Sequence, residues 1–131
     1  MSKRQFPMFD EPKPSDASSQ RVAIVGSRGY PDEQQVRAYV RALPEGTIVV
    51  SGGARGVDSW AEQEARARGL SVVVHYPQWG TFGRSAGFKR NQLIVESCTR
   101  GVAFWDGKSR GTMDTVRKMK RASKPIEVFK P

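Results

Sequence analysis

Short β-branched runs alternate with longer stretches of helically spaced apolar residues along the chain from Arg21 onward. The β-branched runs predict five strands, at 22–26, 47–51, 70–74, 101–105 and 126–129. The stretches between them predict four helices, near 32–42, 56–68, 85–98 and 112–123. Strands that alternate with helices in this way are typical of βαβ units, so we expect an α/β fold with a mainly parallel sheet.

Apolar spacing also predicts which side of each helix packs on the sheet. In the second helix this face comprises Val57, Trp60, Ala61 and Ala65. In the third helix it is expected to comprise Leu93, Ile94 and Ser97. A loop containing Pro77, Trp79, Gly80 and Gly83 precedes the third helix, and its length indicates more than a simple connection.

The chain has 131 residues, of which 37% are apolar, and this suffices for a single core. Residues 1–20 are rich in proline, serine and charged side chains, which predicts a flexible tail before a single domain at 21–131. The N-terminus lacks the apolar segment of a signal peptide, and no run approaches the roughly 18 apolar residues that span a bilayer. We therefore expect a cytoplasmic protein without a membrane partner.

Glycine-rich loops follow three of the predicted strands. They are Gly26-Ser27-Arg28-Gly29, Ser51-Gly52-Gly53-Ala54-Arg55-Gly56-Val57-Asp58 and Asp106-Gly107-Lys108-Ser109-Arg110-Gly111-Thr112. Glycine lets backbone N–H groups approach a ligand closely, and a following helix N-terminus favours an anion. Ligands of open α/β sheets bind beyond the carboxyl ends of the strands, so the three loops predict one shared site for a nucleotide or another phosphorylated ligand.

The first loop lacks the G-x-G-x-x-G pattern of a dehydrogenase-type dinucleotide site, and the second strand does not end in an acidic residue. Asp58 has two interpretations: it hydrogen-bonds a ribose or positions its loop, or it stabilises the start of its own helix. His75 is the only histidine and Cys98 the only cysteine, so we expect no metal site, and we expect both residues to be structural.

The net charge is +9, and the sequence pI is about 10.2. Residues 1–20 carry equal numbers of basic and acidic side chains, so the excess belongs to residues 21–131. A cluster near the C-terminus comprises Lys108, Arg110, Arg117, Lys118, Lys120, Arg121 and Lys124. It predicts either a nucleic-acid-binding patch or a solvated helix face, and the sequence favours neither.

Motifs along most of residues 21–131 resemble those of one superfamily. They are Val25-Gly26-Ser27-Arg28, the Ser51–Asp58 loop, Pro77-x-Trp79 with Ala86-Gly87 and Arg90-Asn91, and the segment from Phe104 to Thr112. In this order they resemble the SLOG superfamily, in particular its small YspA/YpsA-like branch. The resemblance implies a Rossmann-like three-layer fold with strand order 3-2-1-4-5. It also implies a nucleotide across the strand ends, and members that often form homodimers or larger homo-oligomers.

The resemblance implies a ligand-lining role for Gly26, Ser27, Arg28, Gly52, Gly53, Arg90, Asn91, Asp106, Gly107, Gly111 and Thr112. To these the loops add Ser51, Arg55, Gly56, Asp58 and Ser109 as phosphate or nucleotide contacts. Trp79 is a candidate for stacking on a base, or else it packs the long loop onto the sheet. We expect the protein to sense or sequester an ADP-ribose or NAD-type molecule, with Trp79 or Tyr30 on the base and no cofactor required. Such a small binder suits a cellular or a phage-encoded protein.

Two further branches of the superfamily provide alternatives. LOG-type phosphoribohydrolases carry P-G-G-x-G-T-x-x-E, but here the segment begins Trp105-Asp106-Gly107 and Thr115 replaces the catalytic glutamate. Hydrolysis of a nucleotide N-glycosidic bond would need another carboxylate, for which Asp106, Asp114 and Asp58 are weak candidates.

The DprA branch has similar G-S-R and S-G-x-A-x-G-I-D segments and binds single-stranded DNA. Basic grooves with aromatic side chains suit that ligand. The residues that would supply such a groove are Trp79, Phe82, Arg84, Lys89 and Arg90.

Overall fold

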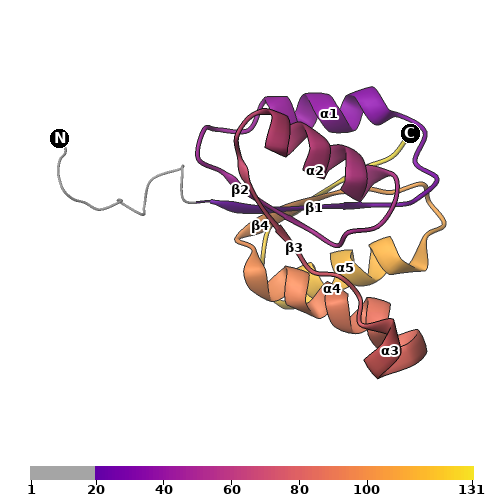
Figure 1. The fold of residues 1–131 in the computed structure, drawn as a ribbon. Coiled ribbons are helices and arrows are strands. Elements are labelled where there is room, and N and C mark those ends of the chain that lie inside the picture. Colours follow the sequence, from indigo (N-terminus) through magenta and orange to yellow (C-terminus); the bar gives the residue numbers. More distant parts are fainter. Residues whose placement is uncertain (1–19) are drawn as a thin grey trace, which may run out of the picture.

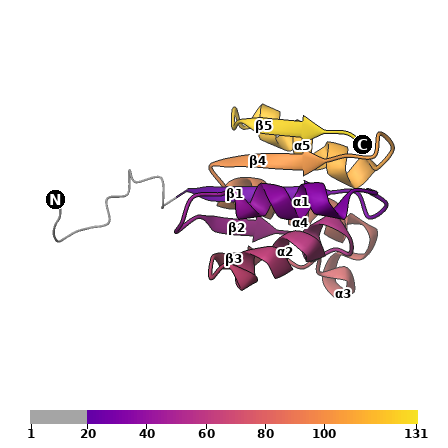
Figure 2. The same ribbon diagram turned by 90° about the horizontal axis from the view of Figure 1, so that it is seen from above.

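A computed structural model describes residues 20–131, and all five strands in it form one parallel sheet. The strands are β1 (Arg21–Gly26), β2 (Ile48–Ser51), β3 (Ser71–Val74), β4 (Arg100–Phe104) and β5 (Ile126–Phe129). Their order is β3-β2-β1-β4-β5, as expected (Figure 2). The predicted Rossmann-like α/β fold is therefore confirmed. The predicted flexible tail lies outside the described residues, except for Gln20, whose carbonyl accepts a hydrogen bond from the Ile48 N–H at 2.9 Å.

Helices cover both faces of the sheet (Figure 1). One face carries α1 (Glu33–Arg41) and α2 (Val57–Ala67), and the other carries α4 (Ala86–Ser97) and α5 (Arg110–Arg121). The alternation along β1 explains the two cores, because successive strand residues point to opposite faces. Val22 and Ile24 pack under α1 and α2, whereas Ala23 and Val25 pack under α4 and α5.

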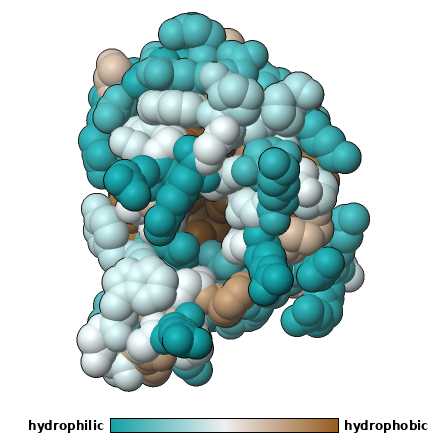
Figure 3. Space-filling model, turned by 90° about the vertical axis from the view of Figure 1, so that its right-hand side faces the viewer, coloured by the Kyte–Doolittle hydropathy of each residue, from teal (hydrophilic) through white to brown (hydrophobic). Residues whose placement is uncertain are grey.

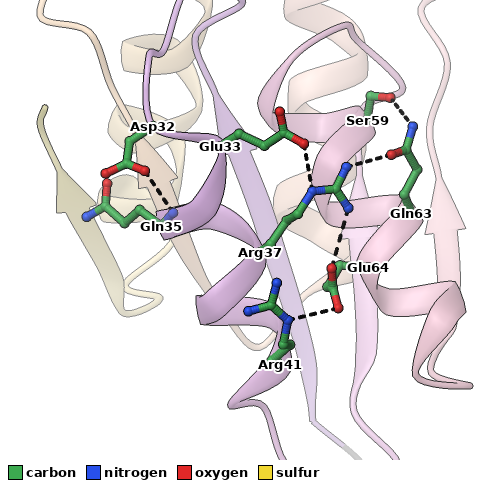
Figure 4. Close-up of polar contacts among 8 residues, drawn as sticks. All are labelled: Asp32, Glu33, Gln35, Arg37, Arg41, Ser59, Gln63 and Glu64. Atoms are coloured by element: carbon green, nitrogen blue, oxygen red, sulfur yellow. Dashed lines mark hydrogen bonds and ion pairs between the residues drawn. The ribbon is translucent and has the colours of Figure 1, made fainter.

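A network of polar contacts joins α1 to α2 (Figure 4). Arg37 lies at its centre, with Nε 2.8 Å from Glu33 Oε2, Nη1 3.4 Å from Glu64 Oε1, and Nη2 2.7 Å from Gln63 Oε1. Arg41 approaches the second oxygen of Glu64 at 3.2 Å. Two arginines of α1 thus share Glu64 of α2, which ties the two helices together.

The segment after β3 differs from the sequence prediction. It contains the short helix α3 (Trp79–Phe82) and the 3-10 turn η2 (Gly83–Ser85). Helix α3 projects from one corner of the fold (Figure 1). The packing face of α4 was also predicted wrongly in part. Ile94 is buried, but Leu93 is 47% exposed, because neighbouring helical residues point about 100° apart.

None of the helices within residues 20–131 is long and apolar enough to cross a bilayer.

Candidate functional site

The loops after β1 and β4 meet where the strand order reverses. β1 pairs with β2 on one side and with β4 on the other, so the chain leaves these two neighbouring strands toward opposite faces. The Ser27 N–H donates to the Phe104 carbonyl at 3.0 Å, and the Asp106 N–H donates to Ser27 Oγ at 3.0 Å. These bonds close the two loops on each other and leave a hollow beyond the strand ends, the place that open α/β sheets use for ligands.

The main cavity has a volume of about 410 Å³ and lies between the end of β1, α4, the loop after β4 and the start of α5. Figure 3 views the fold from the carboxyl ends of the strands and shows a central hollow with an apolar floor and a largely polar rim. The lining residues are Val25, Gly26, Arg28, Gly29, Ala54, Asp58, Trp79, Arg84, Gly87, Phe88, Arg90, Asn91, Ile94, Asp106, Ser109, Gly111, Thr112 and Thr115.

A second depression of about 370 Å³ adjoins the main cavity above β2 and β3. It shares Arg28, Ala54, Trp79 and Arg90 with the main cavity, and it adds Gly52, Gly53, Arg55, Tyr76 and Pro77. The two depressions therefore form one continuous concave surface along the carboxyl ends of the strands. We call this surface the carboxyl-end groove.

Most of the predicted site residues line the carboxyl-end groove. The main cavity contains Gly26, Arg28, Asp58, Trp79, Arg90, Asn91, Asp106, Ser109, Gly111 and Thr112, and the second depression contains Gly52, Gly53 and Arg55. Four predicted residues line neither: Ser27, Ser51, Gly56 and Gly107.

The two serines among these four face the protein. Ser27 is 1% exposed and bonds to the Asp106 N–H, and Ser51 is fully buried and donates to Glu62 Oε2 at 2.6 Å. Gly56 has a φ of +76°, and a Cβ there would lie 2.9 Å from the Arg28 carbonyl oxygen. Its role is to let two loops approach each other, which only glycine permits at that φ.

The carboxylate of Asp58 lies behind the second glycine loop. Asp58 is 4% exposed, its Oδ2 accepts the Ala54 N–H at 3.2 Å, and its Oδ1 has no hydrogen-bond partner within residues 20–131. Burial raises the pKa of Asp58 to about 7, against the lowering effects of the Ala54 N–H and of Arg90. The Asp58 carboxylate therefore occupies one of the loop's own N–H groups. This contact positions the loop, which is one of the interpretations that the sequence offered for Asp58.

Arg90 connects α4 to the same loop. Its Nη1 donates to the Gly52 carbonyl, and its Nε donates to Asn91 Oδ1 at 2.9 Å. Burial lowers the pKa of Arg90, while the nearby Asp58 raises it. Arg90 thus lines the groove and also holds the loop in place.

The third glycine loop is closed by its own acidic residue as well. Asp106 Oδ1 accepts the N–H groups of Lys108 at 2.8 Å and Ser109 at 2.9 Å, and these bonds lower the pKa of Asp106. Ser109 in turn caps α5 by accepting the Thr112 N–H at 3.2 Å. Gly107 has a φ of +89°, which the tight turn requires.

The carboxylates considered for N-glycosidic hydrolysis are occupied by structural bonds. Asp114 pairs with Lys118 Nζ at 2.6 Å and accepts from Asn91 Nδ2 at 3.0 Å, and it does not line the main cavity. Thr115, in the place of the family's glutamate, does line it. No cluster of three or more metal-ligating side chains occurs within residues 20–131.

The aromatic candidates separate clearly. Trp79 is 54% exposed and lines both depressions, and it lies beside Gly87 of α4 instead of packing on the sheet. Tyr30 is 2% exposed, packs edge-on against Phe104 and donates its hydroxyl to Gln35. Tyr30 therefore belongs to the core, and the prediction that it contacts a base is wrong.

Sequence reasoning missed two exposed aromatic side chains at the groove, Tyr76 and Phe88. Phe88 is 46% exposed on α4, and an aromatic residue on the polar side of a helix was the signal that could have identified it.

Arg84 lines the main cavity, as expected for a nucleic-acid groove. Lys89 does not line this cavity, and its Nζ lies 5.0 Å from the centre of the Phe82 ring. His75 bonds to Ser97 Oγ at 2.7 Å and Cys98 is buried, so both have structural surroundings.

Comparison with known proteins identifies the family. Residues 6–78 match the DNA recombination-mediator protein A family. The chain is 34% identical over 119 residues to the Gene 61 protein of Mycobacterium phage D29, an alignment that covers 83% of this chain and 95% of the phage protein.

Two solved structures share the fold. One is DNA processing protein A from Helicobacter pylori, whose structural study concerns its single-stranded DNA binding mode, with a TM-score of 0.69 and 23% identity over 86% of this chain. The other is DprA from Streptococcus pneumoniae, with a TM-score of 0.70 and 19% identity over 83%. The match spans only 66% and 50% of those two chains. On the family match and the phage relative together, the chain belongs to the DNA recombination-mediator protein A family.

Proposed function

We propose that the chain binds single-stranded DNA along the carboxyl-end groove. The observation that carries this proposal is the composition of the rim, which contains both exposed aromatic side chains and exposed arginines. The aromatic members are Tyr76, Trp79 and Phe88, and the arginines are Arg28, Arg55 and Arg84. Single-strand binding combines cations that follow the backbone with aromatic faces on which bases stack.

The arginines of the rim are free to meet phosphates. Within residues 20–131, none of Arg28, Arg55 and Arg84 forms an ion pair with a carboxylate. Their charge is therefore not compensated locally, and binding to a polyanion would release counterions from it.

The loop amides support a long ligand over a compact one. Asp58 occupies the Ala54 N–H, and Asp106 occupies those of Lys108 and Ser109. Affinity for phosphate must then come mainly from arginine side chains spread along the rim. Arginines distributed over two adjoining depressions suit successive phosphates of a strand better than the adjacent phosphates of ADP-ribose.

Family membership supports the same choice. The matched residues 6–78 include the loops that carry Arg28 and Arg55, and the Helicobacter pylori protein of the same fold is described as binding single-stranded DNA. These findings favour the DNA alternative over the ADP-ribose ligand expected first. The YspA/YpsA-like branch stays a prediction.

Fluorescence anisotropy with a labelled oligo-dT at several salt concentrations tests the proposal. We expect the affinity of the wild-type protein to fall steeply with salt, and the double variant Arg28→Ala, Arg84→Ala to bind at least about tenfold more weakly. Two lost phosphate contacts should reduce the slope of log K against log salt by about 1.4, since each contributes about 0.7 on single strands.

The matched control is Arg66→Ala, Arg121→Ala, which removes two exposed arginines from the last turns of α2 and α5. Those turns lie at the opposite end of the sheet, so the control should bind as the wild type does. Salt-independent binding, or an equal loss in both double variants, would overturn the proposal. ADP-ribose at a millimolar concentration in the same assay should leave the DNA bound, and displacement would restore the small-ligand prediction.

A further inference from the structure

A third depression lies beside the main cavity, at the start of α5, and we call it the α5 cleft. It has a volume of about 320 Å³, and its aromatic walls are Phe88 and Trp105. Trp105 Nε1 donates to the Ser109 carbonyl at 3.0 Å, which fixes the indole ring in place. Lys130 Nζ lies 5.3 Å from the centre of that ring and adds a cation at the edge.

The charge of the α5 cleft is strongly positive. Lys108, Arg110 and Arg117 line it, and none of them has an ion pair within the described part of the chain. The acidic residue that lines it, Asp114, is already paired with Lys118 at 2.6 Å. Three cations therefore face the cleft without compensation, beside two aromatic rings.

The α5 cleft adjoins the carboxyl-end groove. Phe88 and Ser109 line both the cleft and the main cavity, so the two depressions adjoin at these residues. The family match at residues 6–78 contains no residue of the cleft, which is built from the later part of the chain. A strand that leaves the main cavity past Phe88 meets cations and aromatic faces again.

We infer that the α5 cleft is an additional nucleotide subsite that takes the continuation of a single strand bound in the carboxyl-end groove. This inference rests on the proposed function, and it adds that the footprint on the strand extends beyond the groove. Cations at the cleft hold the backbone, and the ring of Phe88 provides a stacking face at the passage between the two sites. It also assigns a role to the basic residues at the start of α5.

Length dependence tests the inference. Oligo-dT of about 4, 8, 12 and 16 nucleotides, the range of known single-strand site sizes, is titrated by anisotropy against wild type and against Lys108→Ala, Arg110→Ala, Arg117→Ala. We expect equal affinities for the shortest oligonucleotide. For the longest, the triple variant should bind at least about tenfold more weakly, and its salt slope should be smaller by about 2, for three contacts of about 0.7 each.

A matched triple variant, Arg66→Ala, Lys120→Ala, Arg121→Ala, loses the same charge from exposed positions at the far end of the helices. It should retain the wild-type length dependence. Circular dichroism melting curves check that both variants fold.

Two results would contradict the inference, and they differ in what they say about the groove. Wild-type length dependence in the cleft variant, or the same loss in the matched control, would overturn the cleft subsite while leaving the groove intact. If the wild-type protein binds no oligonucleotide of any length, the proposed function itself fails, and the cleft inference fails with it.

Discussion

Arginines between α1 and α2 are paired with carboxylates, whereas those around the carboxyl-end groove are not. Arg37 lies between Glu33 and Glu64, and Arg41 shares Glu64 (Figure 4). Arg28 and Arg84 are exposed and have no such partner within residues 20–131. Arginine therefore stabilises the fold in one region, and in the other region its charge remains available to a ligand.

The two regions also differ in how they contribute to the net charge of +9. Between α1 and α2, acidic and basic groups neutralise each other locally, so little field extends into solvent. At the strand ends and at the start of α5, positive charge is left over. There the unpaired cations lie beside exposed aromatic side chains, so substitutions in the two regions should affect different measurements.

The largest expected effect comes from reversing charge at the groove. The double variant Arg28→Glu, Arg84→Glu should lower the affinity for oligo-dT about 100-fold or more, because it removes two cations and places two anions beside phosphates. Stability in urea should change by less than about 0.5 kcal/mol, since both side chains are exposed. A large loss of stability with unchanged binding would show that these two arginines stabilise the fold and do not contact the DNA.

The second effect concerns Asp58, the buried carboxylate at the junction of the two regions. Its pKa is raised to about 7 in the fold from 3.8, so the folded state binds the proton more tightly than the unfolded chain does. Stability should therefore fall as pH rises from about 4 to about 7, by roughly 2 kcal/mol or more.

Asp58→Asn should remove this pH dependence, which urea unfolding at pH 5, 6, 7 and 8 would detect. The amide can still accept the Ala54 N–H, so the loop should keep its shape. If the variant retains the wild-type pH profile, Asp58 is not the titrating group.

The third effect isolates stacking from charge. Trp79→Leu should weaken oligo-dT binding about tenfold, because stacking of one base on an aromatic ring contributes about 1–3 kcal/mol. The salt slope should stay at the wild-type value, since no cation is lost. Leu93→Ala is the control and should not change affinity, because Leu93 is exposed on α4 and lines neither depression of the groove.

The smallest effect is expected on the paired side. Arg37→Ala should lower the free energy of unfolding by about 1 kcal/mol, because it breaks ion pairs and hydrogen bonds that are only partly shielded from water. DNA affinity should stay within about twofold of the wild type in anisotropy titrations, as a single remote cation contributes little at physiological salt. A loss of binding as large as that of a rim variant would contradict the separation of the two regions.

The pattern of the sequence predicted the elements well, and its errors have local causes. All five strands and the four long helices lie within a few residues of their predicted positions. The turn of helix at Trp79–Phe82 was missed because four residues carry too little periodicity to be recognised. Leu93 was assigned to the core because the sequence does not report the helix's exact rotation on the sheet.

Side-chain orientation separated the candidate residues in a way that sequence could not. Ser27 and Ser51 sit in glycine loops next to expected phosphate contacts, yet both hydroxyls are taken by partners far along the chain or on the next helix. Tyr30 follows the first loop but packs on Phe104. In each case a long-range contact, absent from any local pattern, decided whether the group faces the ligand side.

By itself the sequence determined the α/β fold, the strand order through its resemblance, and the three loops at the strand ends, because apolar periodicity and glycine placement are local properties. Only the tertiary structure decided which cations remain unpaired and which aromatic faces stay exposed. Glu64 reaches Arg37 across 27 positions, while no carboxylate within residues 20–131 forms an ion pair with the Arg28 guanidinium or the Lys108 ammonium group. Charge compensation depends on distance in space, and the folding of the chain sets that distance.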